Sequence, residues 1–289
     1  MTLHLLDKLV GQELAKKIIS QTLRKKGEIY NFLFFGPDGV GKRKTALLLA
    51  KSLLCPEGGC EICPVCQKID FFTFHDFSLI VPITAQIRDE EIHEYTRQFA
   101  NPNNTTRLEE KTTITIDQIR ELQANLKFRP IGSQRRVVVI LDVDRMNKYA
   151  ANCFLKTLEE PPPGTVFILT ASRLYSVMPT IRSRCQLVPF RYLRGNEIRE
   201  ILETAFGEIG QIPFDDFGLG SISETLLIAK SNYLTAALEI FKKSPLSTTS
   251  ILKLVETYEK RSVLDLIYIL LILYRTAILV KLGYTPTNR

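Results

Sequence analysis

The chain has 289 residues, of which 45% are hydrophobic and 24% are charged. This is the composition of an ordinary globular protein of about two domains, and it excludes a fibrous or largely disordered chain. The net charge of +7 permits an acidic or nucleic-acid partner without requiring one. The most apolar stretch, Leu266 to Tyr274, is far shorter than the roughly 20 residues of a membrane span, so we expect no contact with a membrane.

A strand, a glycine-rich loop and a helix are predicted to follow one another from residue 30. The run "YNFLFFG" is typical of a buried strand, and "KTALLLAKSLL" of a helix. Between them lie the residues of a phosphate-binding loop, Gly36, Gly39, Gly41 and Lys42. The next position normally carries a hydroxyl that binds Mg²⁺. Here it is Arg43, which has only hydrogen-bond donors and cannot bind a cation.

The run "RRVVVILDVD" predicts a second buried strand that ends in acids. Asp142 occupies the position of a metal-orienting acid, and Val143, which follows, cannot act as a base. If the register differs by one, Leu141 takes the first position and Asp142 the second. In either register one role is empty. With Arg43, this predicts a degenerate nucleotide site that does not hydrolyse ATP, although the loop and Lys42 leave binding of ATP or ADP open.

Four of the six cysteines lie close together in "CPEGGCEICPVC". Cys55, Cys60, Cys63 and Cys66 offer four thiolates, the ligand set of a closed, structural Zn²⁺ site. Free thiols and an iron–sulfur cluster are the alternatives. The two remaining cysteines are isolated, so the pattern favours a reducing cytoplasm over a disulfide framework.

Strands alternate with helices up to about residue 190, which predicts an α/β domain with a parallel sheet at 1–190. Within it, the polar segment 77–113 has weak periodicity and is interpreted as an insertion or a flexible loop. Helical patterns dominate afterwards, and we divide them into a small domain at 191–241 and a second piece at 242–289.

Several segments together resemble one family. "LVGQELAKK", "GPDGVGK", the four cysteines, "IDQIREL", "DRMNKYAANCFLKTLEEPPPGT" and "MPTIRSRCQ" occur in the order found in the delta-prime subunits of the bacterial DNA polymerase III clamp loader, which are AAA+ proteins. The likeness covers most of residues 9 to 190. It implies an AAA+ domain with a zinc module at 55–66, a helical lid at 191–241 and a short helical collar for oligomerisation at 242–289.

The resemblance also implies a role in DNA replication. Such subunits form a heteropentameric ring with gamma/tau-type ATPases and a delta-type subunit, and the ring loads a sliding clamp at primer–template DNA. The stretch Ser183-Arg184-Cys185 is similar to the motif that projects an arginine finger into a neighbour's ATP site, although from the residues alone Arg182 and Arg184 could be ordinary surface charges. Active members carry Thr after the loop lysine and Glu after the strand aspartate, so the departures here favour a non-hydrolysing subunit. The alternative is a catalytically active AAA+ ATPase, in which Thr45 or Asp144 replaces a missing group.

Overall fold

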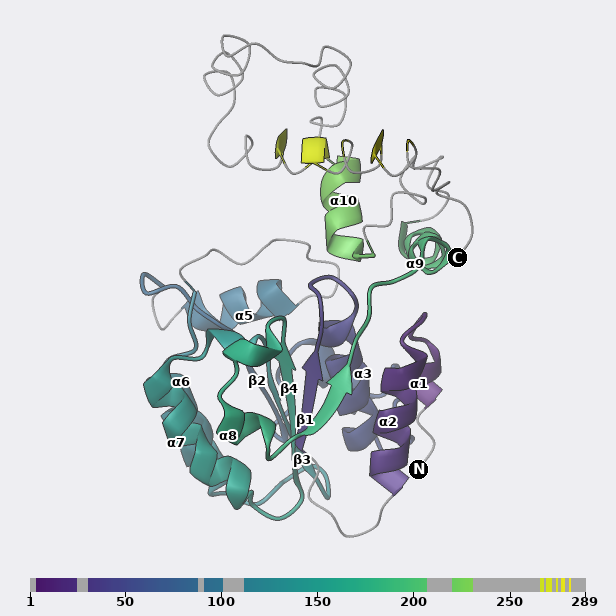
Figure 1. Cartoon of the computed structure of the whole chain (residues 1–289). Coiled ribbons are helices and arrows are strands. Elements are labelled where there is room, and N and C mark those ends of the chain that lie inside the picture. The colour runs from purple at the N-terminus through teal and green to yellow at the C-terminus, as the bar shows by residue number, and fades with distance from the viewer. Residues whose placement is uncertain are drawn as a thin grey trace. The chain divides into compact units, whose positions relative to one another are not determined.

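The computed structural model describes residues 4–24, 31–87, 91–100, 112–206 and 220–230, with isolated residues between 266 and 281 (Figure 1). The chain divides into two units, Met1–Tyr192 and Leu193–Arg289. The boundary predicted at 190 lies two residues before this division. The second predicted boundary, at 241, lies outside the described residues.

A five-stranded sheet forms the centre of the first unit. Its strands are β1 (Asn31–Phe35), β2 (Phe77–Ile80), β3 (Arg136–Ile140), β4 (Thr165–Ala171) and β5 (Gln186–Pro189). They lie in the order β2-β3-β4-β1-β5, and every neighbouring pair is parallel. The predicted α/β fold is therefore confirmed, and the carboxyl ends of all five strands meet at one edge of the sheet.

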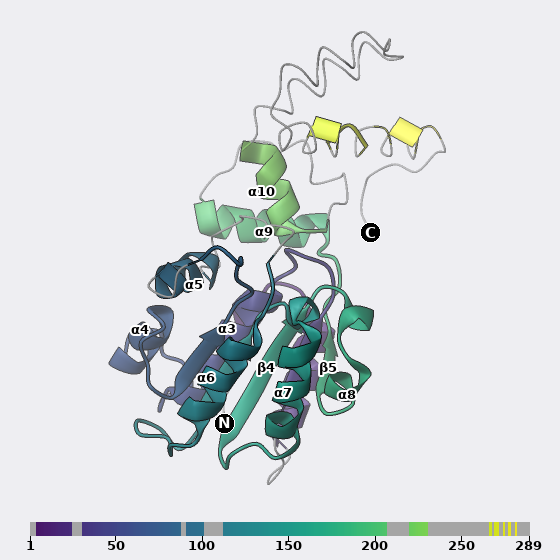
Figure 2. The ribbon, with the colours of Figure 1, turned by 90° about the vertical axis from the view of Figure 1, so that its left-hand side faces the viewer.

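Helices cover both faces of this sheet (Figures 1 and 2). Helices α1 (His4–Asp7), α2 (Glu13–Arg24), α3 (Lys42–Leu54) and α4 (Pro64–Asp70) precede β2 in the chain, and α5 (Ile92–Ala100) follows it. Helices α6 (Ile116–Leu126), α7 (Lys148–Glu159) and α8 (Pro179–Arg182), with the short 3₁₀ turns η2 (Val143–Arg145) and η3 (Leu174–Ser176), complete the unit. In Figure 2, α6 and α7 lie side by side across one face of the sheet.

Alternation along β1 divides the apolar side chains between two cores. Phe32 and Phe34 pack with α2 and α3 in one core, while Leu33 packs with α6 and α7 in the other. All three residues are fully buried. Successive side chains of a strand point to opposite faces, so an apolar run of this length is what a strand covered on both sides requires.

The helices on the second face begin and end where the sequence indicates. Thr115 caps α6, and its partner Gln118 completes a reciprocal capping box, which satisfies two amides that the helix leaves unpaired. The Asn147 side chain accepts from the Ala150 amide at the start of α7. Helix α7 ends at Glu159, with one residue between it and the proline run that begins at Pro161.

The interpretation of 77–113 as an insertion or flexible loop is wrong at its start, where residues 77–80 belong to the central sheet. Its first four residues are β2, the edge strand, which pairs with β3 from Phe77↔Val137 to Ile80↔Ile140. Ile92–Ala100 is helix α5, and Ile83 forms an isolated bridge with Thr113. A four-residue edge strand leaves too few residues for its periodicity to stand out from the polar sequence around it. Residues 88–90 and 101–111 lie outside the described part of the chain.

The second unit contains two described helices, α9 (Gly195–Phe206) and α10 (Ile222–Lys230). They share a small apolar cluster formed by Leu193, Ile198, Leu202 and Leu226. The described residues of the whole chain contain no helix that is both long and apolar enough to cross a membrane.

Gly36 sits where backbone segments approach most closely. Its φ is +146°, and a Cβ atom added there would lie 2.2 Å from the carbonyl oxygen of Phe190.

We therefore expect Gly36→Ala to lower the free energy of unfolding by about 2–3 kcal/mol, as measured by denaturant unfolding. Gly41→Ala is the matched control, because φ is also positive (+98°) but the added atom would lie 3.5 Å from a Leu9 methyl group; we expect it to cost about 1 kcal/mol. Equal effects of the two substitutions would contradict this account.

Candidate functional site

The phosphate-loop residues lie between β1 and α3, as predicted. The loop leaves the carboxyl end of β1, and Lys42 is the first residue of α3, with Gly41 in a left-handed conformation at the N-cap. The loop is joined to the sheet by the Gly36 amide, which donates to the Ala171 carbonyl at the end of β4 (3.3 Å). The first amides of α3 therefore point into the space beyond the strand ends, which is the arrangement that binds phosphate oxygens.

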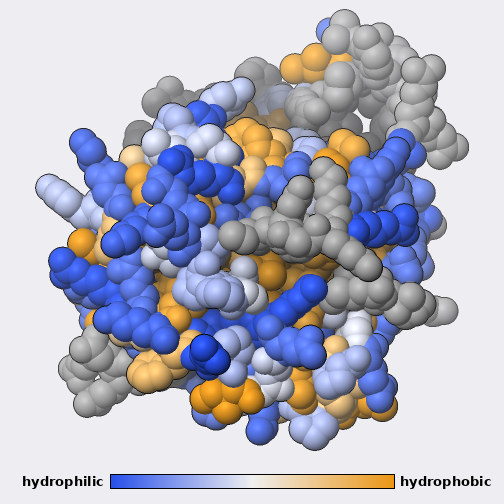
Figure 3. Space-filling model, turned by 90° about the horizontal axis from the view of Figure 1, so that it is seen from below, coloured by the Kyte–Doolittle hydropathy of each residue, from blue (hydrophilic) through white to orange (hydrophobic). Residues whose placement is uncertain are grey.

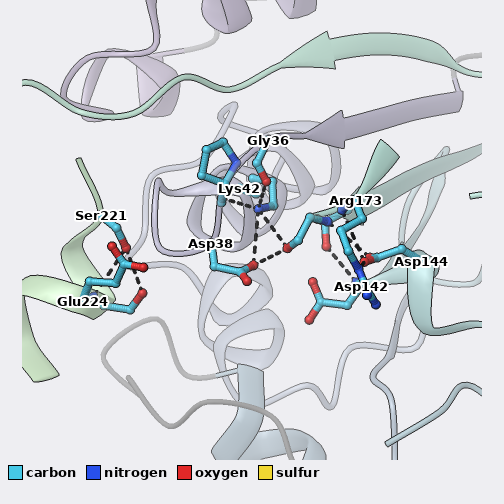
Figure 4. Close-up of polar contacts among 12 residues, drawn as sticks. Gly36, Asp38, Lys42, Asp142, Asp144, Arg173, Ser221 and Glu224 are labelled. Atoms are coloured by element: carbon cyan, nitrogen blue, oxygen red, sulfur yellow. Dashed lines mark hydrogen bonds and ion pairs between the residues drawn. The ribbon is translucent and has the colours of Figure 1, made fainter. Parts of the chain in front are cut away.

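The Lys42 ammonium is held by its own loop (Figure 4). It donates to the carbonyls of Gly36 (2.6 Å) and Pro37 and to the Ser172 hydroxyl (3.3 Å), and it lies 3.8 Å from the Asp38 carboxylate. Only 6% of Lys42 is exposed. Burial lowers its pKa, and the nearby carboxylates of Asp38 and Asp142 oppose that shift.

The residue after Lys42 is Arg43, which has neither a hydroxyl group nor any other metal ligand. Arg43 is the second residue of α3, and its pKa is lowered by burial, while the charge of Asp142 acts in the opposite direction. The hydroxyl of Thr45 donates to the Gly41 carbonyl (2.9 Å), and the residue is fully buried. Thr45 is therefore part of the first turn of α3 and does not reach the space beyond the loop.

The acids after β3 have separate roles. Asp142 adopts a left-handed conformation (φ 51°), and burial raises the pKa of its carboxyl, against the influence of Arg43 and Lys42. Its amide donates to the Thr170 hydroxyl. On either side of it, Leu141 and Val143 are apolar and buried. In both registers considered from the sequence, one of the two positions is thus filled by a side chain that can neither bind a metal nor accept a proton.

The Asp144 carboxylate binds the residues that directly follow β4. Its carboxylate accepts from the amides of Ser172 (3.2 Å) and Arg173 (3.3 Å) and pairs with the Arg173 guanidinium (Figure 4). The Ser172 hydroxyl in turn contacts Asp38 as well as Lys42. Asp38 and Arg173 belong to this network but were not found from the sequence, because Asp38 fills an unspecified position of the phosphate-loop pattern and Arg173 belongs to no motif.

The four clustered cysteines are brought together between α3 and α4. Cys55 caps the end of α3, Cys63 caps the start of α4, and Cys66 lies within α4. All four Sγ atoms are within 4.8 Å of one another. The Sγ atom of Cys55 lies 3.8 Å from that of Cys60 and 3.7 Å from that of Cys63. The cluster could hold one metal ion.

Backbone amides support the sulfur atoms. The Cys63 amide donates to Cys60 Sγ (3.3 Å), and the Cys66 amide donates to Cys63 Sγ (3.4 Å). Although burial opposes the shift, backbone amides that include that of Cys60 lower the pKa of Cys55 to about 6. Such donors stabilise a thiolate, which is the form that binds metal. For Cys63 and Cys66, burial and the neighbouring sulfurs outweigh the amides and raise the pKa.

Arg184 lies near the amino ends of the strands, opposite the end at which the phosphate loop lies. The Asn31 side chain, at the first residue of β1, donates to the Arg184 carbonyl (3.3 Å), whereas the phosphate loop follows the last residue of the same strand. Five residues of strand separate these edges by about 13 Å. Arg184 therefore cannot contact a phosphate held by the loop of its own chain. Figure 3 shows the face seen from the side of the amino ends of the strands, which is mostly hydrophilic with small separate hydrophobic patches.

The neighbours of Arg184 differ in environment. The Ser183 hydroxyl donates to the Thr180 carbonyl (3.1 Å) and lies 3.4 Å from an Arg184 nitrogen. Cys185 packs against the apolar core beneath α7 and α8, and burial raises the pKa of its thiol to about 12. Arg182, two residues before Arg184, has its guanidinium over the ring of Tyr175, 5.5 Å from the ring centre.

Known proteins with similar sequences are subunits of DNA polymerase III. The model of the family described as "DNA polymerase III, delta subunit" matches residues 11–194. The delta' subunit of Bacillus subtilis (strain 168) is 30% identical over 189 residues, covering 64% of this chain and 49% of the relative. The gamma subunit of Buchnera aphidicola subsp. Schizaphis graminum (strain Sg) is 32% identical over 222 residues, covering 75% of this chain and 53% of the relative.

A solved structure is also similar. The DNA polymerase III gamma-subunit-related protein of Thermotoga maritima has 24% sequence identity and a TM-score of 0.47, and the match covers 83% of this chain and 66% of that one. The chain spans about half the length of the two curated relatives above. Because the family model matches well over half of its residues, the chain belongs to the clamp-loader family of DNA polymerase III, a group of AAA+ proteins that includes delta', gamma and tau subunits.

Proposed function

We propose that this chain is a delta-prime-type subunit of a DNA polymerase III clamp loader, which does not hydrolyse ATP itself and donates Arg184 to the ATP site of a neighbouring subunit. Its partners are gamma/tau-type ATPases and a delta-type subunit in a cytoplasmic heteropentameric ring. The ring loads a sliding clamp onto primer–template DNA during replication. ATP or ADP can bind at the degenerate loop without turnover.

The observation that carries this proposal is the loss of two separate groups at one site. Hydrolysis at a phosphate loop needs a hydroxyl that holds Mg²⁺ and a group that orients or activates water. Arg43 replaces the first, and in the simpler register the buried Val143 replaces the second. Gly36, Gly39, Gly41, Lys42 and Asp142 keep the form of the site, so we assign them to a degenerate nucleotide-binding pocket.

The alternative of an active AAA+ ATPase requires a substitute for each missing group. Thr45 is the next hydroxyl along the chain, but it donates to the Gly41 carbonyl and is buried. Asp144 is the next acid along the chain after Asp142, but its carboxylate already accepts from two amides and pairs with Arg173. Because these contacts already occupy both side chains, they favour the non-hydrolysing subunit over the active enzyme.

Arg184 fits a role in trans because it is exposed and lies away from its own loop. A guanidinium beside the γ-phosphate stabilises the charge that develops in the transition state. Arg182 is a poorer candidate, since its guanidinium is engaged with Tyr175. Ser183 and Cys185 support the turn that presents Arg184, through the Thr180 carbonyl and the apolar core respectively.

The finger assignment predicts a large effect of Arg184→Ala on a neighbour. In a loader reconstituted with gamma/tau-type and delta-type subunits, we expect single-turnover ATP hydrolysis at the adjacent site to fall about a thousandfold. Arg182→Ala is the matched control and should leave that rate nearly unchanged. An unchanged rate with Arg184→Ala, in a loader that still assembles, would exclude this role.

We assign the four-cysteine cluster to structural Zn²⁺. A tetrahedral site with Zn–S bonds of about 2.3 Å places its sulfurs about 3.8 Å apart, close to the two Cys55 distances of 3.7 and 3.8 Å. An iron–sulfur cluster spreads four thiolates over two irons or four, so it fits four sulfurs that all lie within 4.8 Å of one another less well than a single ion does. When bound, the ion would tie the end of α3 to the start of α4.

The metal assignment predicts one zinc per chain by elemental analysis. Cys60→Ser should lose the zinc and lower the melting temperature, because the binding free energy of a structural ion contributes to folding. Cys153→Ser, which changes a thiol outside the cluster, should keep the full zinc content. Iron without zinc in the purified chain would contradict the assignment.

A further inference from the structure

The guanidinium of Arg184 is held on one side by its own chain. Nη1 donates to the Thr180 carbonyl (2.9 Å) and lies 3.4 Å from the Ser183 hydroxyl, while Nη2 pairs with the Glu159 carboxylate. Among the described residues, Nε has no partner. Since a guanidinium has five N–H donors, part of it remains available to a phosphate from outside the chain.

The backbone beside Glu159 is held in place by a buried side chain. It is the last residue of α7, and the preceding carbonyl, that of Leu158, accepts from the Asn31 amide (3.2 Å). The same amide group donates to the Arg184 carbonyl (3.3 Å), and Asn31 is only 8% exposed. One buried side chain thus joins the backbone that carries Glu159 to the backbone that carries Arg184.

We propose that Glu159 is a positioning residue for Arg184: it holds the guanidinium in the orientation that a neighbouring subunit's ATP requires. This inference rests on the proposed function and adds the residue that orients the Arg184 guanidinium. The arginine side chain has many rotamers, and ordering it costs free energy whenever it engages a ligand. The Glu159 pair and the Thr180 hydrogen bond restrict those rotamers before the neighbour's phosphate arrives.

The pair is partly exposed, with 35% of the Arg184 side chain and 45% of the Glu159 side chain accessible, so its contribution is modest. In the reconstituted loader, we expect Glu159→Gln to lower kcat for ATP about two- to five-fold. KM for ATP should not change, because the finger acts in the transition state. Glu159→Asp, which keeps the charge, should retain more of the rate than Glu159→Gln. Glu160→Gln is the matched control, since it removes a charge one residue further along, and it should have no effect.

The same assay in an Arg184→Ala loader separates positioning from a general structural effect. There, Glu159→Gln should cause no further loss, because the two residues act through one group. An unchanged or increased kcat with Glu159→Gln, or an equal loss in the Arg184→Ala background, would overturn the positioning role. If Arg184→Ala reduces hydrolysis but Glu159→Gln does not, this inference fails and the finger stands. If Arg184→Ala has no effect, the proposed function itself fails.

Discussion

Strand β1 is the element on which both candidate sites depend. Its alternating side chains are buried in two different cores, so neither its register nor its direction can shift without exposing aromatic or aliphatic surface. The phosphate loop leaves one end of this strand, and Asn31 at the other end is hydrogen-bonded to the Arg184 carbonyl. A single buried strand therefore keeps the two sites at opposite edges of the sheet. This separation is what a subunit needs if its arginine is to serve a neighbour.

Opposite charges balance one another around the phosphate loop. Asp38, Asp142 and Asp144 gather at the carboxyl edge of the sheet, and Lys42, Arg43 and Arg173 supply cations from the chain itself. Asp38 is exposed, but Asp142 and Asp144 are shielded from water, and a buried carboxylate is costly unless it is paired or hydrogen-bonded. Arg43 brings a fixed positive charge close to Asp142, at the position where active phosphate loops have a metal-binding hydroxyl. Arg43 thus also helps to neutralise the Asp142 carboxylate, whose pKa it lowers against the effect of burial.

The sequence was sufficient for features that local pattern determines. The strand–loop–helix unit and the four cysteines both follow from residue types at fixed spacing, and the structure contains both. It was insufficient where the partner lies far along the chain. Glu159 and Arg184, Asn31 and Leu158, and Asp144 and Ser172 are brought together only by the sheet and its helices. Strand β2 was missed because four residues at a sheet edge carry little periodicity; its place is determined by pairing with β3.

The most direct test compares Lys42→Ala with Arg184→Ala, each introduced into this chain alone within one reconstituted loader, by measuring ATP hydrolysis under single-turnover conditions. If this chain's own loop does not hydrolyse ATP and its arginine acts at a neighbour's site, Lys42→Ala will leave the rate nearly unchanged. Arg184→Ala will lower turnover at the adjacent site about a thousandfold. The opposite pattern, with loss of hydrolysis on removing Lys42 and little change on removing Arg184, would contradict the account.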